Sequence, residues 1–511
     1  MENRNWAIVS ALAASVAFGG CMKRSGSHSV SADASMGGSR FLPSVSGERY
    51  AHNPQSPFVA VADAPLSTFS ADVDTGAYSN TRRFLTGGSL PPVDAVRIEE
   101  LVNYFDYAYP EPAGADPLAA VSEVGPCPWS AEHQLVHIGI QGKHVRADEV
   151  PPRNLVFLVD TSGSMRGEGR LPLLRSGLSQ LASTLRQQDH VSIVVYAGDS
   201  GVALQPTNDK RRIRRALGRM KAGGSTNGEA GIDLAYAVAA RNFQPGAINR
   251  VILATDGDFN VGQSSDGELV RIIEDKRKSG VYLSVLGFGE GNYNESMMEQ
   301  LADRGNGNYA YIDSEQEAKR VLVDQATSTL VPIADDVKLQ VEFNPALVEA
   351  YRLVGYENRE LDSEDFDDDQ EDAGDVGAGH TVTALYEIVP AGAGEHAGKL
   401  DPVSESNVSA ASASAELMTV KIRYKQPGDS QSALISFPVH NVSTSAPSEA
   451  FRFSAAVASF GMLLRDSPHK GSATFTNALA LAEGAVGQDR DGARREFLDL
   501  VRTASDLSSG G

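Results

Sequence analysis

A short polar loop at residues 160–164, with the sequence Asp-Thr-Ser-Gly-Ser, directly follows the uninterrupted apolar run 155–159. Such a run is typical of a buried parallel strand, and open α/β sheets bind ligands at the edge where these strands end. Asp160, Ser162 and Ser164 alternate along the loop and offer one carboxylate and two hydroxyl groups. Because hard divalent cations prefer oxygen ligands, the loop predicts a site for an ion such as Mg²⁺.

The elements that must position this loop follow from the pattern between residues 154 and 330. Apolar runs there alternate with segments whose apolar residues recur at helical spacing, as at Leu171, Leu174 and Leu178. The runs predict strands at 155–159, 191–196, 202–204, 251–254, 281–286 and 309–312. The other segments predict helices at 171–185, 209–220, 268–278, 296–302 and 315–330, with a further helix after the loop 223–227. Regular alternation of this kind predicts a doubly wound, mostly parallel α/β sheet with helices on both faces.

In this region the sequence resembles a von Willebrand factor A domain, because three loops match the metal-ion-dependent adhesion site of that family. The first is the DxSxS element formed by Asp160, Ser162 and Ser164. The second supplies Thr226, in the sequence Gly-Ser-Thr-Asn, and the third supplies Asp256, in Ala-Thr-Asp-Gly-Asp. Each position falls at the end of a predicted strand or at the start of a predicted helix. The resemblance implies that these five residues bind Mg²⁺, with Mn²⁺ or Ca²⁺ as the alternatives.

The ligand chemistry of that family implies what the bound cation does. Its hydroxyl ligands coordinate the metal directly and its carboxylates often act through water, so the cation keeps a net positive charge and an open position. The resemblance therefore implies an adhesion-type binding module whose protein partner supplies a carboxylate. A degenerate site, in which Asp160 and Asp256 only cap helices, is the structural alternative.

Two other classes of function compete with metal-dependent binding. One is a structural or envelope assembly factor whose metal site is dispensable. The other is a metal-dependent hydrolase that uses Asp160 and Asp256, but enzymatic metal sites usually include a poised base and several strong ligands. No His accompanies the five ligand positions in the sequence. We therefore expect a protein that is not an enzyme.

Outside the A domain, the chain is similar to the YfbK-like lipoproteins of bacteria. The similarity rests on the block 69–112, which begins Phe-Ser-Ala-Asp-Val-Asp-Thr, and on the blocks 354–359 and 379–388. It implies three domains, which are an N-terminal family module at 65–150, the A domain at 151–331 and a C-terminal family-specific domain at 332–511.

Local patterns predict the content of the two flanking regions. In the N-terminal module they predict a helix at 79–85, a second helix after Pro91-Pro92 and an antiparallel strand at 134–141. Strands at 337–341, 348–354, 381–388 and 418–424 predict a β-sandwich-like module in the C-terminal region. Helices at 448–464, 475–485 and 491–504 predict a small bundle that packs beside it.

Two short motifs in the N-terminal block imitate enzyme signatures. Residues 73–77, Val-Asp-Thr-Gly-Ala, match the local signature of aspartic proteases, and Asp72 with Asp74 imitates the DxD motif of phosphatases. A pepsin-like site needs a second such loop in an all-β fold, and a phosphatase of the haloacid type needs Thr or Val where Gly76 stands. Turn formation and helix capping are the preferred interpretation.

An acidic run at 362–375 has nine Asp or Glu among its fourteen residues. Such a run could hold Ca²⁺, but Gln370 occupies the position where the EF-hand frame requires Gly. A solvated acidic loop is therefore the preferred interpretation.

The first residues predict a targeting segment. The apolar stretch 6–18 has about the length of a signal-peptide core and is too short to span a bilayer. It ends in Phe-Gly-Gly-Cys, which resembles a bacterial lipoprotein signal with Cys21 as the lipidated residue; a plain secretory signal is the alternative. We expect a signal at 1–21, a flexible tether at 22–64 and a membrane-anchored lipoprotein in the bacterial cell envelope.

Charge and length indicate the number of domains and exclude some classes of ligand. The chain of 511 residues is too long for one core, so several domains are expected. Its formal net charge of −21 argues against binding to nucleic acid or to anionic lipid. Cys127 is the only cysteine besides Cys21, and we expect it to be a small buried hydrophobe.

Overall fold

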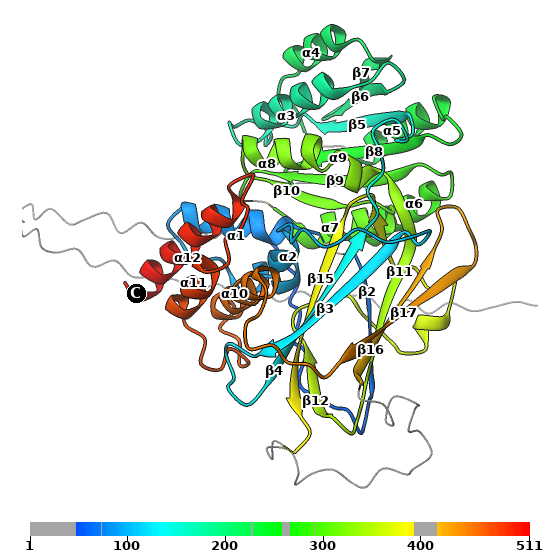
Figure 1. The fold of residues 1–511 in the computed structure, drawn as a ribbon. Helices are drawn as coiled ribbons and strands as arrows, with labels where there is room; N and C mark the ends of the chain where they lie inside the picture. The colour runs from blue at the N-terminus through cyan, green and yellow to red at the C-terminus, as the bar shows by residue number, and fades with distance from the viewer. Residues whose placement is uncertain are drawn as a thin grey trace, which may run out of the picture. The chain divides into compact units, whose positions relative to one another are not determined.

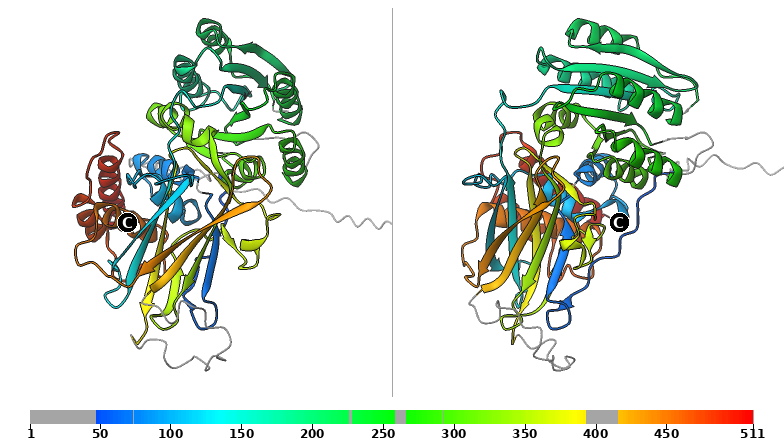
Figure 2. Two further views of the ribbon diagram at one scale, coloured as in Figure 1. Left: turned by 45° about the vertical axis from the view of Figure 1, so that its right-hand side comes forward. Right: turned by 90° about the vertical axis from the view of Figure 1, so that its right-hand side faces the viewer.

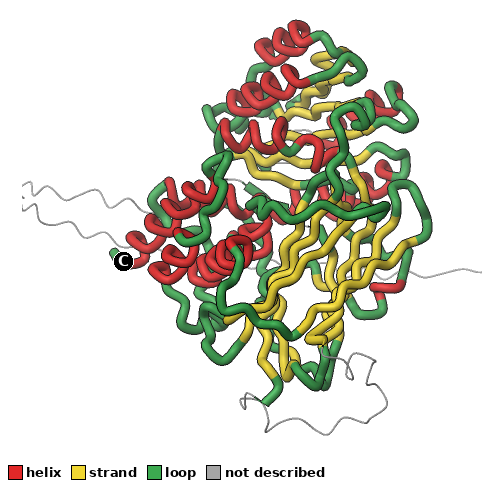
Figure 3. Tube along the Cα trace, viewed as in Figure 1, coloured by secondary structure: helices red, strands yellow, loops and turns green. Residues whose placement is uncertain are grey.

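The computed structural model describes residues 47–72, 74–225, 228–257, 266–291, 293–392 and 416–510. These residues form three sheets and two groups of helices. Figure 1 labels most of the helices and strands, and Figure 3 colours helices red and strands yellow. Within the described part of the chain, no helix is both long and apolar enough to cross a bilayer.

The A domain contains one six-stranded sheet in the order β10-β9-β8-β5-β6-β7. Its strands are β5 (Arg153–Asp160), β6 (His190–Tyr196), β7 (Ser200–Thr207), β8 (Ile248–Thr255), β9 (Tyr282–Phe288) and β10 (Tyr309–Ile312). Strand β7 runs antiparallel to β6 at one edge, and the other neighbours are parallel. The predicted mostly parallel sheet is therefore confirmed, with the short strand 202–204 as the core of the longer β7.

Helices cover both faces of this sheet, as the two views of Figure 2 show. They are α3 (Leu171–Thr184), α4 (Lys210–Arg219), α5 (Gly228–Arg241), α6 (Asp266–Arg277), α7 (Glu295–Arg304), α8 (Glu315–Lys319) and α9 (Ala326–Leu330). Because side chains alternate along a strand, Phe157 packs with α3, α4 and α8, whereas Leu158 packs with α5, α6 and α7. The helix predicted at 315–330 is interrupted by a π-helical turn at Arg320–Asp324, where Arg320 donates a hydrogen bond to the carbonyl oxygen of Tyr104.

Two antiparallel sheets form a sandwich whose strands come from both ends of the chain. One has the order β1 (Val59–Ala60), β12 (Val348–Leu353), β15 (Thr381–Pro390), β4 (Gln134–Gly142) and β3 (Leu118–Pro126). The other has the order β13 (Glu360–Leu361), β2 (Leu66–Ser70), β11 (Pro332–Phe343), β16 (Glu416–Lys425) and β17 (Ser432–His440), with β14 (Gly374–Gly377) paired to β11. Phe343 stacks on Tyr351 across the two sheets, with ring centroids 4.0 Å apart.

This arrangement corrects two of the predicted domain boundaries. Residues 65–150 and 332–511 are not separate domains, since β4 pairs with β15 and β2 pairs with β11 in shared sheets. The predicted tether also extends too far, because β1 pairs with β12 and Arg49 donates a backbone hydrogen bond to Tyr293. In both cases the decisive contacts join residues that are far apart in the sequence.

The A domain is an insertion into this sandwich. The chain leaves the sandwich after β4 and returns to it at β11, and both connections meet the segment that precedes β15. There Lys143 accepts a backbone hydrogen bond from Gly379, and Val331 accepts one from Ala378. The entry and the exit of the A domain therefore lie side by side.

Helices from both ends of the chain pack together around a core of their own. They are α1 (Gly76–Thr86), the 3₁₀ turn Val93–Ala95, α2 (Ile98–Asn103), α10 (Glu449–Leu464), α11 (Phe475–Glu483) and α12 (Ala493–Ser509). Phe105, Phe453 and Phe497 pack edge to face in this core. Cys127 is buried there, as predicted, and burial raises the pKa of its thiol to about 12.

Candidate metal centre

Strands β5 and β8 bring two of the predicted ligands to the same edge of the A-domain sheet. Asp160 is the last residue of β5 and is fully buried, and Asp256 directly follows β8 and is 2% exposed. The parallel register pairs Val159 with Ala254, which sets Asp160 beside Thr255. The hydroxyl of Thr255 donates a hydrogen bond of 3.3 Å to Oδ2 of Asp160. The two carboxylates thus face the same space beyond adjacent strands.

The first loop folds back over this space. The backbone N–H of Ser162 donates to Oδ1 of Asp160 at 2.7 Å, which turns the chain immediately after the strand. The turn brings the hydroxyl oxygens of Ser162 and Ser164 to 2.8 Å from each other. The structure therefore places the carboxylate and the two hydroxyls of the DxSxS element together.

The second loop is joined to the first by backbone hydrogen bonds. Gly223 donates to the carbonyl oxygen of Thr161 at 2.7 Å, and Gly163 donates to that of Gly224 at 3.1 Å. Thr226, the fifth predicted ligand, lies outside the described residues, so its place in the site stays a prediction.

An arginine that the sequence analysis did not single out organises the rim. Nε of Arg170 lies 3.7 Å from Oδ2 of Asp256, and the same guanidinium donates to the carbonyl oxygens of Ser164 and Glu290. Gly289 makes room for it, because a Cβ at that position would lie 2.0 Å from Nε of Arg170. No local sequence pattern indicates this residue, since its partners come from three different loops.

The donor set suits a hard divalent cation. Two hydroxyls and two carboxylates offer only oxygen atoms, which Mg²⁺, Mn²⁺ and Ca²⁺ accept. Burial raises the pKa of Asp160 to about 6, and the carboxylate of Asp256 contributes to the rise. A bound cation would favour the charged form of Asp160, because opposite charges lower the pKa of a carboxyl group. The described residues therefore fit the metal that the sequence predicts.

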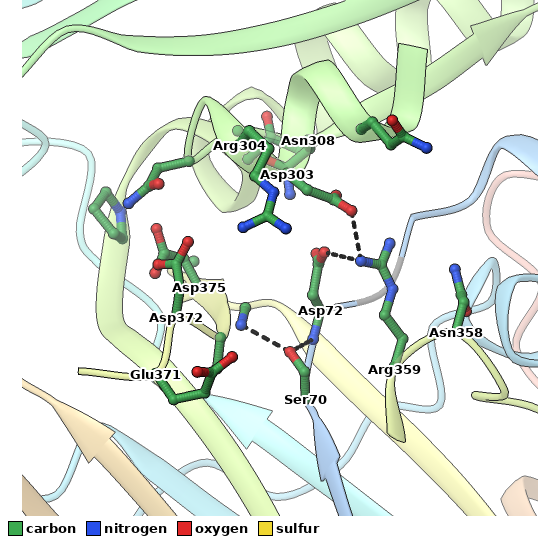
Figure 4. Close-up of a pocket in the computed structure, with 18 of the residues that line it drawn as sticks. Ser70, Asp72, Asp303, Arg304, Asn308, Asn358, Arg359, Glu371, Asp372 and Asp375 are labelled. Carbon is green, nitrogen blue, oxygen red and sulfur yellow. Dashed lines mark hydrogen bonds and ion pairs between the residues drawn. The ribbon is translucent and has the colours of Figure 1, made fainter. Parts of the chain in front are cut away.

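A second carboxylate group lies between the A domain and the sandwich, beside a polar cavity of about 280 Å³ (Figure 4). Oxygen atoms of Asp72, Asp74 and Asp303 lie within 4.8 Å of one another. The guanidinium of Arg359 already occupies the position of a cation, at 2.9 Å from Asp72, 2.8 Å from Asp303 and 3.4 Å from Asp74. We interpret this group as a clamp between domains.

The clamp corrects the expected role of one aspartate. Asp74 was predicted to serve a turn or a helix cap, but helix α1 has no side-chain hydrogen bond at its N-cap, Thr75. Oδ1 of Asp74 instead accepts a hydrogen bond of 2.8 Å from the backbone N–H of Tyr309, in strand β10. The long-range partner outcompetes the local one because Asp74 is buried at a domain interface.

The acidic run 362–375 is held by lysines of the sandwich. Nζ of Lys338 donates to the carbonyl oxygens of Asp365 and Asp368, at 2.8 and 2.5 Å. Nζ of Lys425 donates to that of Asp369 at 2.7 Å. The run is thus an ordered segment whose carbonyl groups bind ammonium groups of the protein.

Three family models match the chain. The von Willebrand factor type A domain matches residues 154–325, the model described as von Willebrand factor matches residues 44–137, and the one described as uncharacterized protein YfbK, C-terminal, matches residues 328–507.

Comparisons with individual proteins and solved structures extend this result. The chain is 44% identical to the uncharacterized protein YfbK of Escherichia coli (strain K12) over 469 residues, which are 90% of this chain and 81% of that protein. It is 25% identical to the human inter-alpha-trypsin inhibitor heavy chain H3 over 208 residues, or 39% of this chain and 23% of that one. A solved structure, von Willebrand factor type A from Catenulispora acidiphila, aligns with a TM-score of 0.41 and 16% identity, over 75% of this chain and 89% of that chain.

Proposed function

Because the chain belongs to the YfbK family of von Willebrand factor type A domain proteins, we propose that it is a divalent-metal-dependent binding protein that recognises a carboxylate of a protein partner. A domains typically mediate protein–protein interactions, and often do so through a metal ion. The proposed metal ligands are Asp160, Ser162, Ser164, Thr226 and Asp256.

One observation carries this proposal. The hydroxyls of Ser162 and Ser164 lie 2.8 Å apart, beside the buried carboxylate of Asp160, at the edge where parallel strands end. Neutral hydroxyls compensate little of the charge of a cation, so a bound Mg²⁺ keeps an affinity for an anionic ligand. The cation would supply Lewis acidity toward the carboxylate of the partner.

The proposal includes a membrane tether. We propose that Cys21 is lipidated and anchors the protein in the bacterial cell envelope, on the basis of the sequence around it. Cys21 lies outside the described residues. Fractionation of cells that express the full chain tests this part. We expect the protein in the membrane fraction and its Cys21→Ser variant in the soluble fraction, and equal membrane association of the two would refute the anchor.

Thermal unfolding with and without metal tests the site. A ligand at about 100 times its Kd stabilises the folded state by roughly 2.7 kcal/mol, so Mg²⁺ or Mn²⁺ should raise the Tm by a few degrees. Asp160→Ala and Ser162→Ala should each remove this shift. Ser459→Ala, which removes a buried hydroxyl of α10 that donates to Ala455, is the matched control and should keep it. An intact protein whose Tm does not respond to any divalent cation would refute the metal centre.

Partner capture then separates binding from assembly. Crosslinking and affinity capture from membranes should recover a partner in the presence of Mg²⁺ and lose it with a chelator. If Asp160→Ala retained the partner at the wild-type level, the metal site would be dispensable and an assembly factor would be the better description.

A further inference from the structure

The outer edge of the A domain carries a concentration of positive charge. Seven of the twelve residues from 210 to 221 are Lys or Arg, in a chain whose formal net charge is −21. They lie on helix α4 and on the turn that follows it, beside strand β7 (Figure 1). The rest of the molecule therefore carries a more negative net charge than the whole chain, in contrast to this basic edge.

Helix α4 presents these cations to solvent. Ile213 and Leu217 are 2% and 3% exposed and face the core, which leaves the basic side chains on the outer face. The exposed cations of this surface are Arg211, Arg212, Arg214, Arg215, Arg219 and Lys221. Among the residues that the structure describes, none of these six forms a salt bridge.

This arrangement does not stabilise the helix. Arg211, Arg215 and Arg219 follow one another at a spacing of four residues, and like charges at this spacing destabilise a helix. Several exposed cations elsewhere on the molecule do have acidic partners, as Arg146 has Asp148 at 2.5 Å and Lys278 has Asp275 at 2.7 Å. A local feature that costs stability without a local benefit indicates a functional surface.

A groove runs between this helix and the sheet. Its volume is about 460 Å³, which falls in the range of roughly 300–1,000 Å³ that is typical of ligand sites. Leu204 and Met220 give it an apolar floor, and Arg212, Arg215 and Arg219 line its rim. The groove thus combines a surface for aliphatic stems with cations for carboxylates.

The groove leads to the candidate metal centre. Thr161, which lines the groove, is the residue after Asp160, and its carbonyl oxygen accepts the hydrogen bond from Gly223 in the second loop. The exposed Arg166 donates to the carbonyl oxygen of Ala222 at 3.4 Å, in the chain segment between Lys221 of the groove and the second loop. A chain bound in the groove therefore reaches the neighbour of Asp160.

Strand β7 offers an additional point of attachment. It is the edge of the A-domain sheet, and within the described ranges it pairs with β6 alone. The unpaired backbone groups of an edge strand can accept an extended segment of another chain. Pro206 restricts this pairing to the first part of the strand, which pairs with the end of β6 that lies beside Asp160.

We propose that the groove between α4 and the sheet binds an extended, Asp- and Glu-rich segment of the partner protein. This inference rests on the proposed function for its last contact, in which one carboxylate of the segment reaches the metal centre. A single extended segment touches only the basic edge. A membrane or a rigid nucleic acid duplex would also approach the strongly acidic remainder of the molecule, which would repel it.

Fluorescence anisotropy with a labelled oligo-glutamate peptide tests the proposal on the full-length chain in Mg²⁺. We expect binding that weakens as the salt concentration rises. The triple variant Arg212→Glu/Arg215→Glu/Arg219→Glu should weaken it about tenfold or more, and Gln at the same three positions should weaken it less. Glu and Gln are good helix formers, so α4 should persist in both variants.

A matched control separates the groove from the overall charge. The variant Arg146→Glu/Lys278→Glu/Arg502→Glu lowers the net charge by the same amount at exposed positions outside the groove, and it should bind nearly as the wild type does. Equal binding by the α4 variant and the wild type would overturn the proposal, and so would an equal loss in the control. Binding to vesicles of phosphatidylglycerol or to duplex DNA without binding to oligo-glutamate would also overturn it.

The two proposals can fail separately. If the groove fails and the metal centre holds, the α4 variant keeps both peptide binding and the rise in Tm with Mg²⁺, and Asp160→Ala loses the rise. If the metal centre fails and the groove holds, no cation changes the Tm, and peptide binding still depends on α4 and on salt.

Discussion

Two sets of arginines, one on the A domain and one that meets it from the flanking regions, have opposite surroundings. Those of helix α4 are exposed and have no salt-bridge partners among the described residues, whereas Arg82, Arg97 and Arg359, at the opposite boundary, are buried against several carboxylates. Arg82 extends from α1 to Asp313 and Glu317 of the A domain, at 2.5 and 2.9 Å.

The two environments give the arginines different roles. A buried guanidinium that pairs with several carboxylates fixes the geometry of the groups around it, because leaving those carboxylates without a partner is costly. An exposed guanidinium without a partner contributes little to folding and remains available to a ligand. The same side chain thus fastens the A domain at one boundary and, in our proposal, recruits a partner at the other.

Removal of Arg359 should have the largest effect. Arg359→Ala would leave Asp72, Asp74 and Asp303 close together without the cation that pairs with them, so we expect a loss of about 3–5 kcal/mol in the free energy of unfolding. Urea denaturation measures it. Arg304→Ala, at an exposed pair with Glu274, is the control and should change the stability by less than about 0.5 kcal/mol. A loss below about 1 kcal/mol for Arg359→Ala would show that the clamp contributes little.

A conservative change at Arg82 should have the next largest effect. Lysine keeps the charge but has one ammonium group where the guanidinium meets Asp313, Glu317 and Glu496 at once. We expect Arg82→Lys to cost roughly 2–3 kcal/mol, again by urea denaturation. A stability equal to that of the wild type would mean that charge alone holds this contact.

The buried carboxyl groups at this boundary predict that the stability of the protein depends on pH. Burial raises the pKa of Glu295 to about 8, with the carboxylates of Glu100 and Glu299 adding to the rise against the opposing effect of Arg97. Between the usual Glu pKa and this value the folded state binds more protons than the unfolded state, so the stability from this group falls as pH rises. Glu295→Gln removes this pH-dependent contribution to the stability.

Unfolding in urea at about pH 5 and about pH 8 checks the sign. We expect the stability of the variant relative to the wild type to rise by roughly 1–3 kcal/mol across this interval. The amide oxygen can still accept the hydrogen bond from Asn80, which limits the structural disturbance. A constant difference at the two pH values would contradict the assignment of a neutral Glu295.

The exposed set should show the smallest effect on folding. The triple Glu variant at Arg212, Arg215 and Arg219 should change the free energy of unfolding by about 0.5 kcal/mol or less, because each side chain is exposed and lacks a salt-bridge partner within the described ranges. A loss comparable to that of Arg359→Ala would show that α4 uses its arginines for structure.

Sequence patterns predicted the A domain well because its signals are local. Each strand from β5 to β10 is a short apolar run, and each long helix shows its own periodicity, so no distant partner was needed to locate them. The proposed ligands Asp160, Ser162, Ser164 and Asp256 could be predicted for the same reason, since each lies in or next to such an element.

The sandwich was harder to predict because its pairing is not local. Strand β2 meets β11 across the whole inserted domain, and neither sequence indicates the other. Strand β3 begins with small side chains, Leu-Ala-Ala-Val-Ser, which give a weak alternation. The role of Asp72 depends on Arg359, and the role of Asp256 depends in part on Arg170, so both required the fold.

The side-by-side entry and exit of the A domain have a consequence for biosynthesis. Strands β2 and β4 leave the ribosome long before their partners β11 and β15, while the A domain between them is complete and has a core of its own. The earliest strands must therefore wait with open edges until the last third of the chain has been made. We expect chains truncated after residue 331 to contain a folded A domain and an aggregation-prone N-terminal segment.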